Sequence, residues 1–345
     1  MLRSWPWSRS MNPFHALYKE KATIAPYGIF TDHSQRAFDR CDFPLLAALT
    51  YTRLNQDGYH IACEFLNFLF MVDEHLEVAS TVEARHIADT VLDALRNPGV
   101  PRPDGEWIGG EITRSFWEKA TKTGTPSFQR RFIDTTSEYL DGCVEHAIDR
   151  SQSNIYDVET YFTLRRKTVG VLPSFAVLGI HMNLTDKVFK DPVIQRLTEL
   201  AVDMIIVRND TLSYNVEQAR GDDSHNVIKI LMETCQTDIQ GALNRASFMH
   251  DQLSTDFLDL IGEMPTFGDT NTDEEVFTYV NGLAQWVRGN DSWSFESHRY
   301  FGSAGPEIQK TGIVQLLPKI CSASLQVPGE CPAGAEIMIK HHGLV

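Results

Sequence analysis

The sequence predicts an all-helical protein, and three observations support that prediction. Apolar residues recur at spacings of three and four, as at Phe65, Phe68 and Leu69. Strict alternation of apolar and polar residues over the length of a strand is hard to find. Stretches rich in turn-forming residues, such as 97–103 and 266–272, separate the periodic segments as loops. Together these patterns favour a bundle of helices.

Each predicted helix has its own run of apolar residues at helical spacing. Leu45, Leu46 and Leu49 begin the series, and the apolar run that ends near Val72 continues it. The further helical segments, in chain order, are 82–95, 112–120, 127–150, 158–164, 192–226, 227–260 and 273–290.

Local signals predict how two of these helices begin and end. Gly170 and Pro173 follow the helix at 158–164 and predict that it breaks there, exposing backbone groups. Thr272, with Glu275 three positions later, predicts a capping box for the helix at 273–290.

Length and composition describe a globular chain of one large domain. The chain has 345 residues, of which 42% are hydrophobic and 22% charged. We expect residues 1–20 to form a flexible extension and 21–302 to form the helical domain. In 303–345 the composition shifts to Gly, Pro, Ser and Ala, which predicts an irregular tail or flap.

Charge and residue usage exclude several classes of function. The net charge of -15 argues against a nucleic-acid binder, which needs a basic patch to neutralise phosphates. No stretch approaches about 18 uninterrupted apolar residues, so no membrane span is expected. Glycine-rich phosphate loops are absent from the sequence, which disfavours nucleotide-binding folds. The six cysteines form no CxxC pair and predict reduced thiols in a cytoplasmic protein.

A row of oxygen donors stands in the helix predicted at 192–226. Asn209, Ser213 and Glu217 are spaced four residues apart, which places an amide, a hydroxyl and a carboxylate on one helix face. Such a row can chelate a hard divalent cation, and Mg2+ prefers oxygen ligands. The same three residue types are also ordinary on a solvent-facing helix, so the row alone leaves both interpretations open.

A second acidic cluster ends the aromatic-rich helix near Val72. Asp73 and Glu77 share a helix face, and Glu74 lies beside them. Like charges at this spacing repel one another by a few tenths of a kcal/mol. We therefore expect the cluster either to face a counter-cation such as a metal ion or to form an acidic helix end in water.

Arginines near helix breaks and ends could bind an anion held between the two clusters. Arg165 and Arg166 precede Gly170, and Arg299 stands beside Tyr300 near the end of the last long helix. The planar guanidinium matches phosphate oxygens. The sequence thus predicts metal and phosphate binding in one cavity.

With these motifs, the chain resembles a class I terpene synthase of the microbial type, most like the fungal (basidiomycete) sesquiterpene synthases. The first metal motif of that family resembles 73–77, and the second, Asn-Asp-x-x-Ser-x-x-x-Glu, matches 209–217 at every defining position. A diphosphate-sensing arginine four positions before a small effector residue corresponds to Arg166 and Gly170, with Arg165 the weaker match. The family's Arg-Tyr pair corresponds to Arg299 and Tyr300.

The resemblance implies a single-domain helical bundle around a central active-site cavity. It implies an enzyme, a carbon-oxygen lyase, that ionises a prenyl diphosphate with three Mg2+ ions, for which Mn2+ could substitute. Farnesyl diphosphate is the expected substrate, and diphosphate plus a sesquiterpene hydrocarbon or alcohol are the expected products. The protein would be a monomer or a homodimer.

The resemblance also assigns roles to residues. Asp73 and the Asn209, Ser213 and Glu217 row would bind metal, with Glu74 and Glu77 as further possible ligands. Arg166, Arg299 and Tyr300 would act on the diphosphate, with Gly170 beside them. The aromatic candidates for lining the cavity and stabilising carbocations are Phe65, Phe68, Phe70, Phe162, Trp286 and Trp293, chiefly Phe65, Phe68, Phe162 and Trp293. Aromatic residues at helical spacing are also typical of a packed core, so both interpretations stay open for each.

Two positions depart from the family pattern. Glu77 stands where the family usually has Asp, and its longer arm is expected to loosen any metal contact there. Val216 replaces a Lys that many relatives carry, which removes one cation unless Arg220 or Lys229 compensates.

Other functions remain open from the sequence. One is an acyclic terpene alcohol synthase of the linalool or nerolidol type that also accepts geranyl diphosphate, and another is a chain-elongating prenyltransferase. A helical metal phosphohydrolase would use His60, His75 and His86 with Asp73, although the sequence lacks the His-Asp dipeptide of that class near these residues. A non-catalytic helical binding protein is the last alternative.

Overall fold

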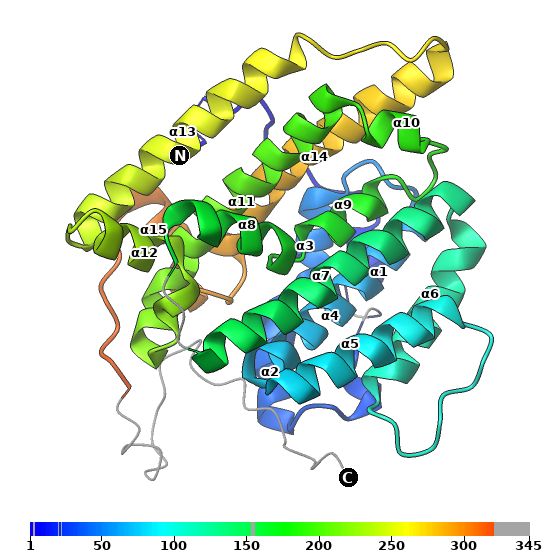
Figure 1. Cartoon of the computed structure of the whole chain (residues 1–345), viewed down its shortest axis with the longest axis horizontal. Coiled ribbons are helices and arrows are strands. Elements are labelled where there is room, and N and C mark those ends of the chain that lie inside the picture. The colour runs from blue at the N-terminus through cyan, green and yellow to red at the C-terminus, as the bar shows by residue number, and fades with distance from the viewer. Residues whose placement is uncertain (3, 20, 22, 153–155, 321–345) are drawn as a thin grey trace.

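The all-helical prediction is confirmed by a computed structural model, which describes residues 1–2, 4–19, 21, 23–152 and 156–320 (Figure 1). The helices of the N-terminal half are α1 (His15–Tyr18), α2 (Asp32–Arg40), α3 (Phe43–Thr50), α4 (Gln56–Val78), α5 (Thr81–Arg96), α6 (Gly109–Thr123), α7 (Pro126–Gln152), α8 (Val158–Thr168), α9 (Val171–Leu178) and α10 (Asp186–Phe189). Those of the C-terminal half are α11 (Pro192–Arg220), α12 (Val227–Thr234), α13 (Ile239–Ile261), α14 (Thr270–Glu296) and α15 (Gly305–Thr311). Short 3-10 turns occur at η1 (Ala25–Tyr27), η2 (Asp223–His225) and η3 (Gly302–Ala304).

Two groups of helices make up the bundle. Helices α4, α5, α6 and α7 pack on one another on one side, and α11 packs against α13 and α14 on the other (Figure 1). Helix α3 joins the groups because it contacts both α4 and α14. The α4 and α11 helices, which carry the two predicted metal motifs, therefore belong to opposite sides of the bundle.

An aromatic cluster fills the space between α4, α6 and α7. Phe65 packs edge-on against Phe132, and Phe68 stacks on Phe116 with ring centroids 5.8 Å apart. Trp117 stacks on Phe132 at 4.8 Å. Burying each of these rings stabilises the fold by about 1.5–3 kcal/mol, so this side of α4 is committed to the core.

The predicted break after the 158–164 helix is confirmed, although the helix itself continues to Thr168. Gly170 adopts a left-handed backbone with φ of +69° and caps the start of α9. That conformation is strained for any residue with a side chain. A Cβ at this position would also lie 3.2 Å from Leu69 on α4. Glycine therefore permits both the turn and the close approach of α4.

Three local predictions are wrong. The helix predicted at 192–226 ends at Arg220, where Gly221 adopts a left-handed backbone and the chain turns through η2. The segment 227–260 is two helices, because the chain turns between α12 and α13, where Gln236 has a positive φ of 48° and Asp238 caps α13 through Gly241 N. The capping box at Thr272 does not form. Helix α14 begins earlier, with Asp269 as its cap, and Glu275 instead accepts a hydrogen bond from Asn183 N at 2.9 Å.

The expected flexible extension at 1–20 instead packs on α14 over its first residues. The Trp5 indole donates to Ala284 O, and the Trp7 indole donates to Asn281 Oδ1, both at 3.1 Å. The Arg288 guanidinium donates to backbone carbonyls of the same segment, including Trp7 O at 2.8 Å. These contacts use tryptophans that periodicity could not place.

The expected irregular tail at 303–345 is described as far as residue 320. It contains α15 and then a stretch that runs along the outer side of α11. Asn215 and Gln218 on that helix donate to Gln315 O and Leu317 O at 3.0 and 2.9 Å. The remainder, 321–345, lies outside the described residues. Within the described part of the chain, none of the helices combines the length and apolar character that crossing a membrane requires.

Candidate active site

The carboxyl-terminal parts of α4 and α11 face each other across one site. The negative charge of Glu217 on α11 contributes to raising the pKa of Glu77 on α4. Arg165 on α8 lies between them, close enough to both Asp73 and Glu217 for each carboxylate to raise its pKa. The structure thus brings together two motifs that are far apart in the sequence, as the sequence predicted.

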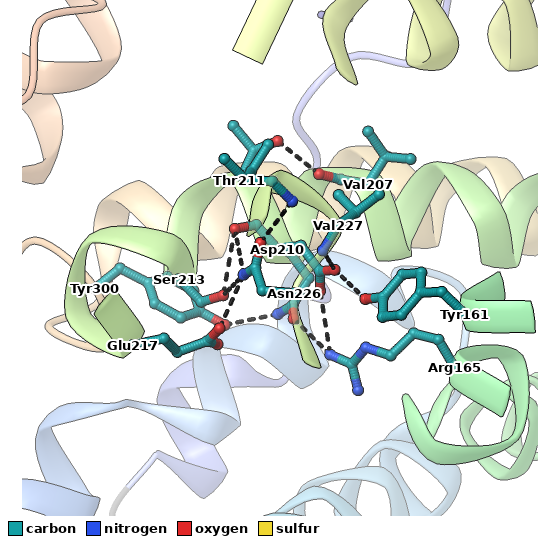
Figure 2. Close-up of polar contacts among 12 residues, drawn as sticks. Tyr161, Arg165, Val207, Asp210, Thr211, Ser213, Glu217, Asn226, Val227 and Tyr300 are labelled. Atoms are coloured by element: carbon teal, nitrogen blue, oxygen red, sulfur yellow. Dashed lines mark hydrogen bonds and ion pairs between the residues drawn. The ribbon is translucent and has the colours of Figure 1, made fainter. Parts of the chain in front are cut away.

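The α11 side of the site is a row of oxygen donors held by partners from other elements (Figure 2). Asn226 Nδ2 donates to Glu217 Oε2 at 2.8 Å and lies 3.4 Å from Ser213 Oγ. Asn209 Nδ2 donates to the Tyr300 hydroxyl at 2.7 Å. Burial and the neighbouring Asp210 raise the pKa of Glu217 to about 7, although the hydrogen bonds from Ser213 and Asn226 lower it.

Asp210 lies outside this row and forms an ion pair with the Arg165 guanidinium instead. Its buried carboxylate accepts hydrogen bonds from the Tyr161 hydroxyl, from Val227 N at 2.8 Å and from Arg165 Nη2 at 3.4 Å (Figure 2). The same Arg165 nitrogen donates to Asn209 Oδ1 at 3.1 Å. Arg165 therefore covers the amide oxygen that the row would offer to a metal ion.

The α4 side of the site is crowded with negative charge. Asp73 Oδ1 accepts a hydrogen bond from the Tyr139 hydroxyl at 3.1 Å, and Glu74 forms an ion pair with Arg299 at 2.6 Å. Glu77 has solvent-exposed surface, and among the described residues it has no hydrogen-bond or ion-pair partner. Protein nevertheless surrounds Glu77, and this desolvation, with the charges of Asp73 and Glu74, raises its pKa to about 8.

The donors present fit a divalent cation. Oxygen ligands and uncompensated carboxylates are what a hard cation binds, and binding would relieve the repulsion that raises these pKa values. In the described ranges, no three His, Cys, Asp or Glu side chains by themselves form a group that could hold a metal. The Asn209 and Ser213 oxygens, or oxygens of a ligand, would have to complete the coordination.

The structure separates the two adjacent arginines, of which the sequence favoured Arg166. Arg166, the expected diphosphate sensor, forms a two-pronged ion pair with Asp203 at 2.7 and 2.8 Å and a further one with Glu199 at 2.9 Å. Arg165 points between α4 and α11, whose facing residues (Asp73, Glu74 and Glu77; Asn209, Ser213 and Glu217) form the two walls of the site. Successive helical residues differ by about 100° in direction, so only one of the pair can face the site. In this geometry Arg165, rather than Arg166, is the arginine that contacts the α11 row.

The predicted Arg299–Tyr300 pair lies at the site, following the end of α14. The Arg299 guanidinium lies 5.5 Å from the centre of the Phe70 ring on α4 and also forms an ion pair with Glu74. The Tyr300 ring packs edge-on against Trp293 at 6.0 Å. The pair therefore links the segment after α14 to both walls, Arg299 to α4 and Tyr300 to α11.

Two of the aromatics expected to line the cavity do not do so. Phe65 and Phe68 lie in the core between α4, α6 and α7, with 0% and 2% of their surface exposed. The Trp293 indole donates to Cys41 O at 2.7 Å, and its ring packs edge-on against Tyr300. Phe162 is on α8 beside Arg166, at 5.9 Å. Phe70, on α4, stacks on Phe43 with ring centroids 4.1 Å apart and has the Arg299 guanidinium over its ring.

The two departures from the family pattern have clear structural settings. Val216 is buried, and Lys229, considered as a replacement cation, forms an ion pair with Glu233 on its own helix at 2.9 Å. Arg220 is exposed at the end of α11. Glu77 remains directed to the site region, where its pKa responds to Asp73 and Glu217.

The histidines required by the phosphohydrolase alternative are each engaged elsewhere or exposed. His60 contacts Glu64 at 3.3 Å and stacks on Tyr18. His75 contacts Met71 O through Nδ1 at 2.8 Å, and His86 is exposed on α5. Since they do not gather around Asp73, the structure gives this alternative no site.

Four residues at the site escaped the sequence analysis as site residues. Tyr139 holds Asp73, and Asn226 holds Glu217. Tyr161 donates to Asp210, which in turn pairs with Arg165. Tyr161 and Arg165 are four positions apart on one helix face, which is a usable signal. Tyr139 and Asn226 reach the site only through tertiary packing and carry no comparable signal.

Comparison with known proteins identifies the family to which the chain belongs. Residues 64–256 match the family model described as terpene synthase family 2, C-terminal metal binding. A Delta(6)-protoilludene synthase of Stereum hirsutum (strain FP-91666) is 44% identical over 319 residues, covering 92% of this chain and 86% of that protein. Sesquiterpene synthase 14 of Postia placenta (strain ATCC 44394 / Madison 698-R) is 41% identical over 321 residues, covering 92% and 91%.

The fold has a counterpart among solved structures. A variant of cucumene synthase superposes with a TM-score of 0.75 at 21% identity, covering 85% of this chain and 99% of that one. The two facing walls, the sequence relatives and the fold agree, and the chain belongs to the terpene synthase family, as a lyase with a divalent-metal-binding region.

Proposed function

We propose that this enzyme ionises farnesyl diphosphate with Mg2+ and releases diphosphate and a sesquiterpene. The observation that carries the proposal is the pair of oxygen-rich walls on α4 and α11, with Arg165 between them. The proposed metal ligands are Asp73, Asn209, Ser213 and Glu217. Mg2+ suits this set because it prefers oxygen ligands and keeps sites for phosphate oxygens, and we propose three ions, with Mn2+ as a substitute.

Bound Mg2+ would stabilise the negative charge that develops on the departing diphosphate. The chain's own contribution to this step comes from its arginines. Arg165 donates to the amide oxygen of Asn209, so metal binding by Asn209 would release the guanidinium toward phosphate oxygens. Arg299 is held by Glu74 on the opposite wall and contributes a second fixed positive charge.

The apolar residues beside the acidic wall suit a carbocation that must be kept from water. Phe70 precedes Asp73 by one helical turn, and Leu69 lies against Gly170. An aromatic face attracts a desolvated cation by about 2 kcal/mol. Because Phe43 and Arg299 already engage the Phe70 ring, we propose Phe162 and Trp293 for this role in place of Phe65 and Phe68.

The product we propose is Delta(6)-protoilludene. The support is the 44% identity to the Stereum hirsutum enzyme of that name over 92% of this chain. An acyclic alcohol such as nerolidol or linalool is the alternative, and it would need only the capture of water after ionisation.

The test is to incubate the purified protein with geranyl, farnesyl or geranylgeranyl diphosphate and Mg2+ and to analyse the volatiles by mass spectrometry. We expect farnesyl diphosphate to give Delta(6)-protoilludene, and chelation of the metal to stop the reaction. Nerolidol as the main product would favour the acyclic alternative. Diphosphate release without any hydrocarbon or terpene alcohol would refute the synthase proposal.

We further propose a cytoplasmic location and a monomer or homodimer. The four cysteines of the described part of the chain are all free thiols, in keeping with a reducing compartment. Size-exclusion chromatography with light scattering would decide the oligomeric state.

A further inference from the structure

The start of α12 meets the α11 row at one fully buried residue, Asn226. We propose that Asn226 is a positioning residue that fixes the orientation of Glu217 and Ser213 for metal binding. This inference rests on the proposed role of those two residues as metal ligands. Asn226 itself is not in either metal motif.

The hydrogen bonds of the Asn226 amide determine which way round it lies. Its Oδ1 accepts from Ile228 N at 2.9 Å and caps α12. Its Nδ2 donates to Glu217 Oε2 at 2.8 Å and to Asp210 O at 2.9 Å, with Ser213 Oγ at 3.4 Å (Figure 2). The reversed amide would place oxygen against two acceptors, Glu217 Oε2 and Asp210 O, and nitrogen against the Ile228 N–H donor, so this orientation is the one that satisfies these partners.

These contacts constrain how Glu217 can present itself to a cation. The hydrogen bond from Asn226 to Oε2 constrains the rotation of the Glu217 carboxylate. Without that donor, Glu217 would be a half-buried carboxylate beside Asp210 that lacks the neutral amide contacting both residues. Partners of this kind typically change metal affinity by about 10–100-fold when removed.

The same helix start also secures the arginine that lies between the walls. Val227 N donates to Asp210 Oδ2 at 2.8 Å, and Asp210 in turn pairs with Arg165. The Asn226 side chain therefore holds Glu217, and the Val227 backbone N–H holds Asp210, which pairs with Arg165. Only the first of these contacts depends on the identity of the residue at 226.

Asn226→Ser separates positioning from capping. Serine caps helices about as well as asparagine, but its short side chain cannot reach Glu217 from the cap position. Asn226→Asp is the second variant, since it keeps the size and the cap but turns the donor facing Glu217 into an acceptor. Asp238→Ala is the matched control, because Asp238 caps α13 through Gly241 N at 2.8 Å without contacting the row.

The test measures the binding of Mn2+ to the full-length protein in the presence of inorganic diphosphate, using electron paramagnetic resonance and calorimetry. We expect Asn226→Ser and Asn226→Asp to weaken Mn2+ binding about 10–100-fold. Raising the Mg2+ concentration should recover part of the lost turnover in Asn226→Ser. Asp238→Ala should lower the melting temperature and leave Mn2+ affinity unchanged.

Glu217→Ala is the reference that separates this inference from the proposed function. If Glu217→Ala weakens Mn2+ binding and neither Asn226 variant does, the positioning role is refuted while the metal site stands. If Glu217→Ala also binds Mn2+ like the native protein, the metal assignment fails and the inference fails with it. A loss of melting temperature in Asn226→Ser without any loss of Mn2+ affinity would assign Asn226 to helix capping alone.

Discussion

The two walls of the site are organised by different forces. On α11, partners from other elements fix the side chains: Asn226 holds Glu217, and Tyr300 holds Asn209. On α4, Tyr139 and Arg299 hold Asp73 and Glu74, but Glu77 has no partner among the described residues, and burial with the neighbouring carboxylates raises its pKa to about 8. The comparison indicates that α11 supplies geometry before any cation arrives, whereas Glu77 on α4 is a carboxyl group whose ionisation a bound cation would favour.

Breaking the α11 wall should have the largest effect on catalysis. Glu217→Ala or Asn209→Ala removes a ligand from the preformed row, and we expect kcat/KM to fall about a hundredfold to a thousandfold. Diphosphate release from farnesyl diphosphate measures the loss, and circular dichroism checks that the fold persists. Near-normal turnover in either variant would mean that the row does not bind the catalytic metal.

Changes in the α4 wall should separate its carboxylates. Asp73→Ala should cost about a hundredfold in kcat/KM, because Asp73 is the acid held toward the site by Tyr139. Glu77→Asp should cost about tenfold or less, since Glu77 contributes charge without a fixed geometry. Steady-state assays over a range of Mg2+ concentrations compare the two. Equal losses would show that Glu77 is itself a ligand.

The adjacent arginines offer a matched pair that tests what lies between the walls. Arg165→Lys keeps the charge but loses the planar fork, and we expect kcat/KM to fall about 10–100-fold. Arg166→Lys should leave turnover within about threefold and lower the melting temperature instead, because Arg166 serves the ion pair with Asp203. The reverse outcome would restore Arg166 as the residue that binds diphosphate.

The smallest expected effect is a pH dependence of stability in the metal-free protein. The folded-state pKa of Glu77 is raised from 4.5 to about 8 and that of Glu217 from 4.5 to about 7. The folded state therefore binds these protons more tightly than the unfolded state, so stability is lost as pH rises through about 7 to 8.

Melting temperatures of metal-free native protein and of a Glu77→Gln/Glu217→Gln variant measure this effect. The native protein should lose more stability than the variant between pH 6 and pH 8.5. Mg2+ with diphosphate should reduce the difference, because a bound cation favours the ionised carboxylates. If the melting temperatures of the metal-free native protein and the variant changed in parallel with pH, Glu77 and Glu217 would not have the raised pKa values described.

Much of the site was predictable because its signals are local. Spacings of four residues placed Asn209, Ser213 and Glu217 on one face, and Gly170 marked the helix break. The choice between Arg165 and Arg166 was not local, because it depends on how α8 packs against α11. Apolar periodicity likewise showed that Phe65 would be buried without showing whether the core or the cavity would bury it.

Asn226 illustrates the other limit of sequence analysis. Its pattern indicates at most a helix cap, and its contact with Glu217 arises because the chain turns back through η2 after α11. The same limit applies to the N-terminal tryptophans, since no neighbouring residue in the sequence indicates that they pack on α14. Contacts between distant segments decide these roles, and one sequence carries no record of them.

A crystal structure with Mg2+ and diphosphate tests the central claim most directly. We predict metal ions bound by oxygens from both walls, Arg165 turned from Asn209 Oδ1 to the diphosphate, and Arg166 still paired with Asp203. Metal ions held by α4 alone, with the Asn209, Ser213 and Glu217 row unligated, would contradict the account.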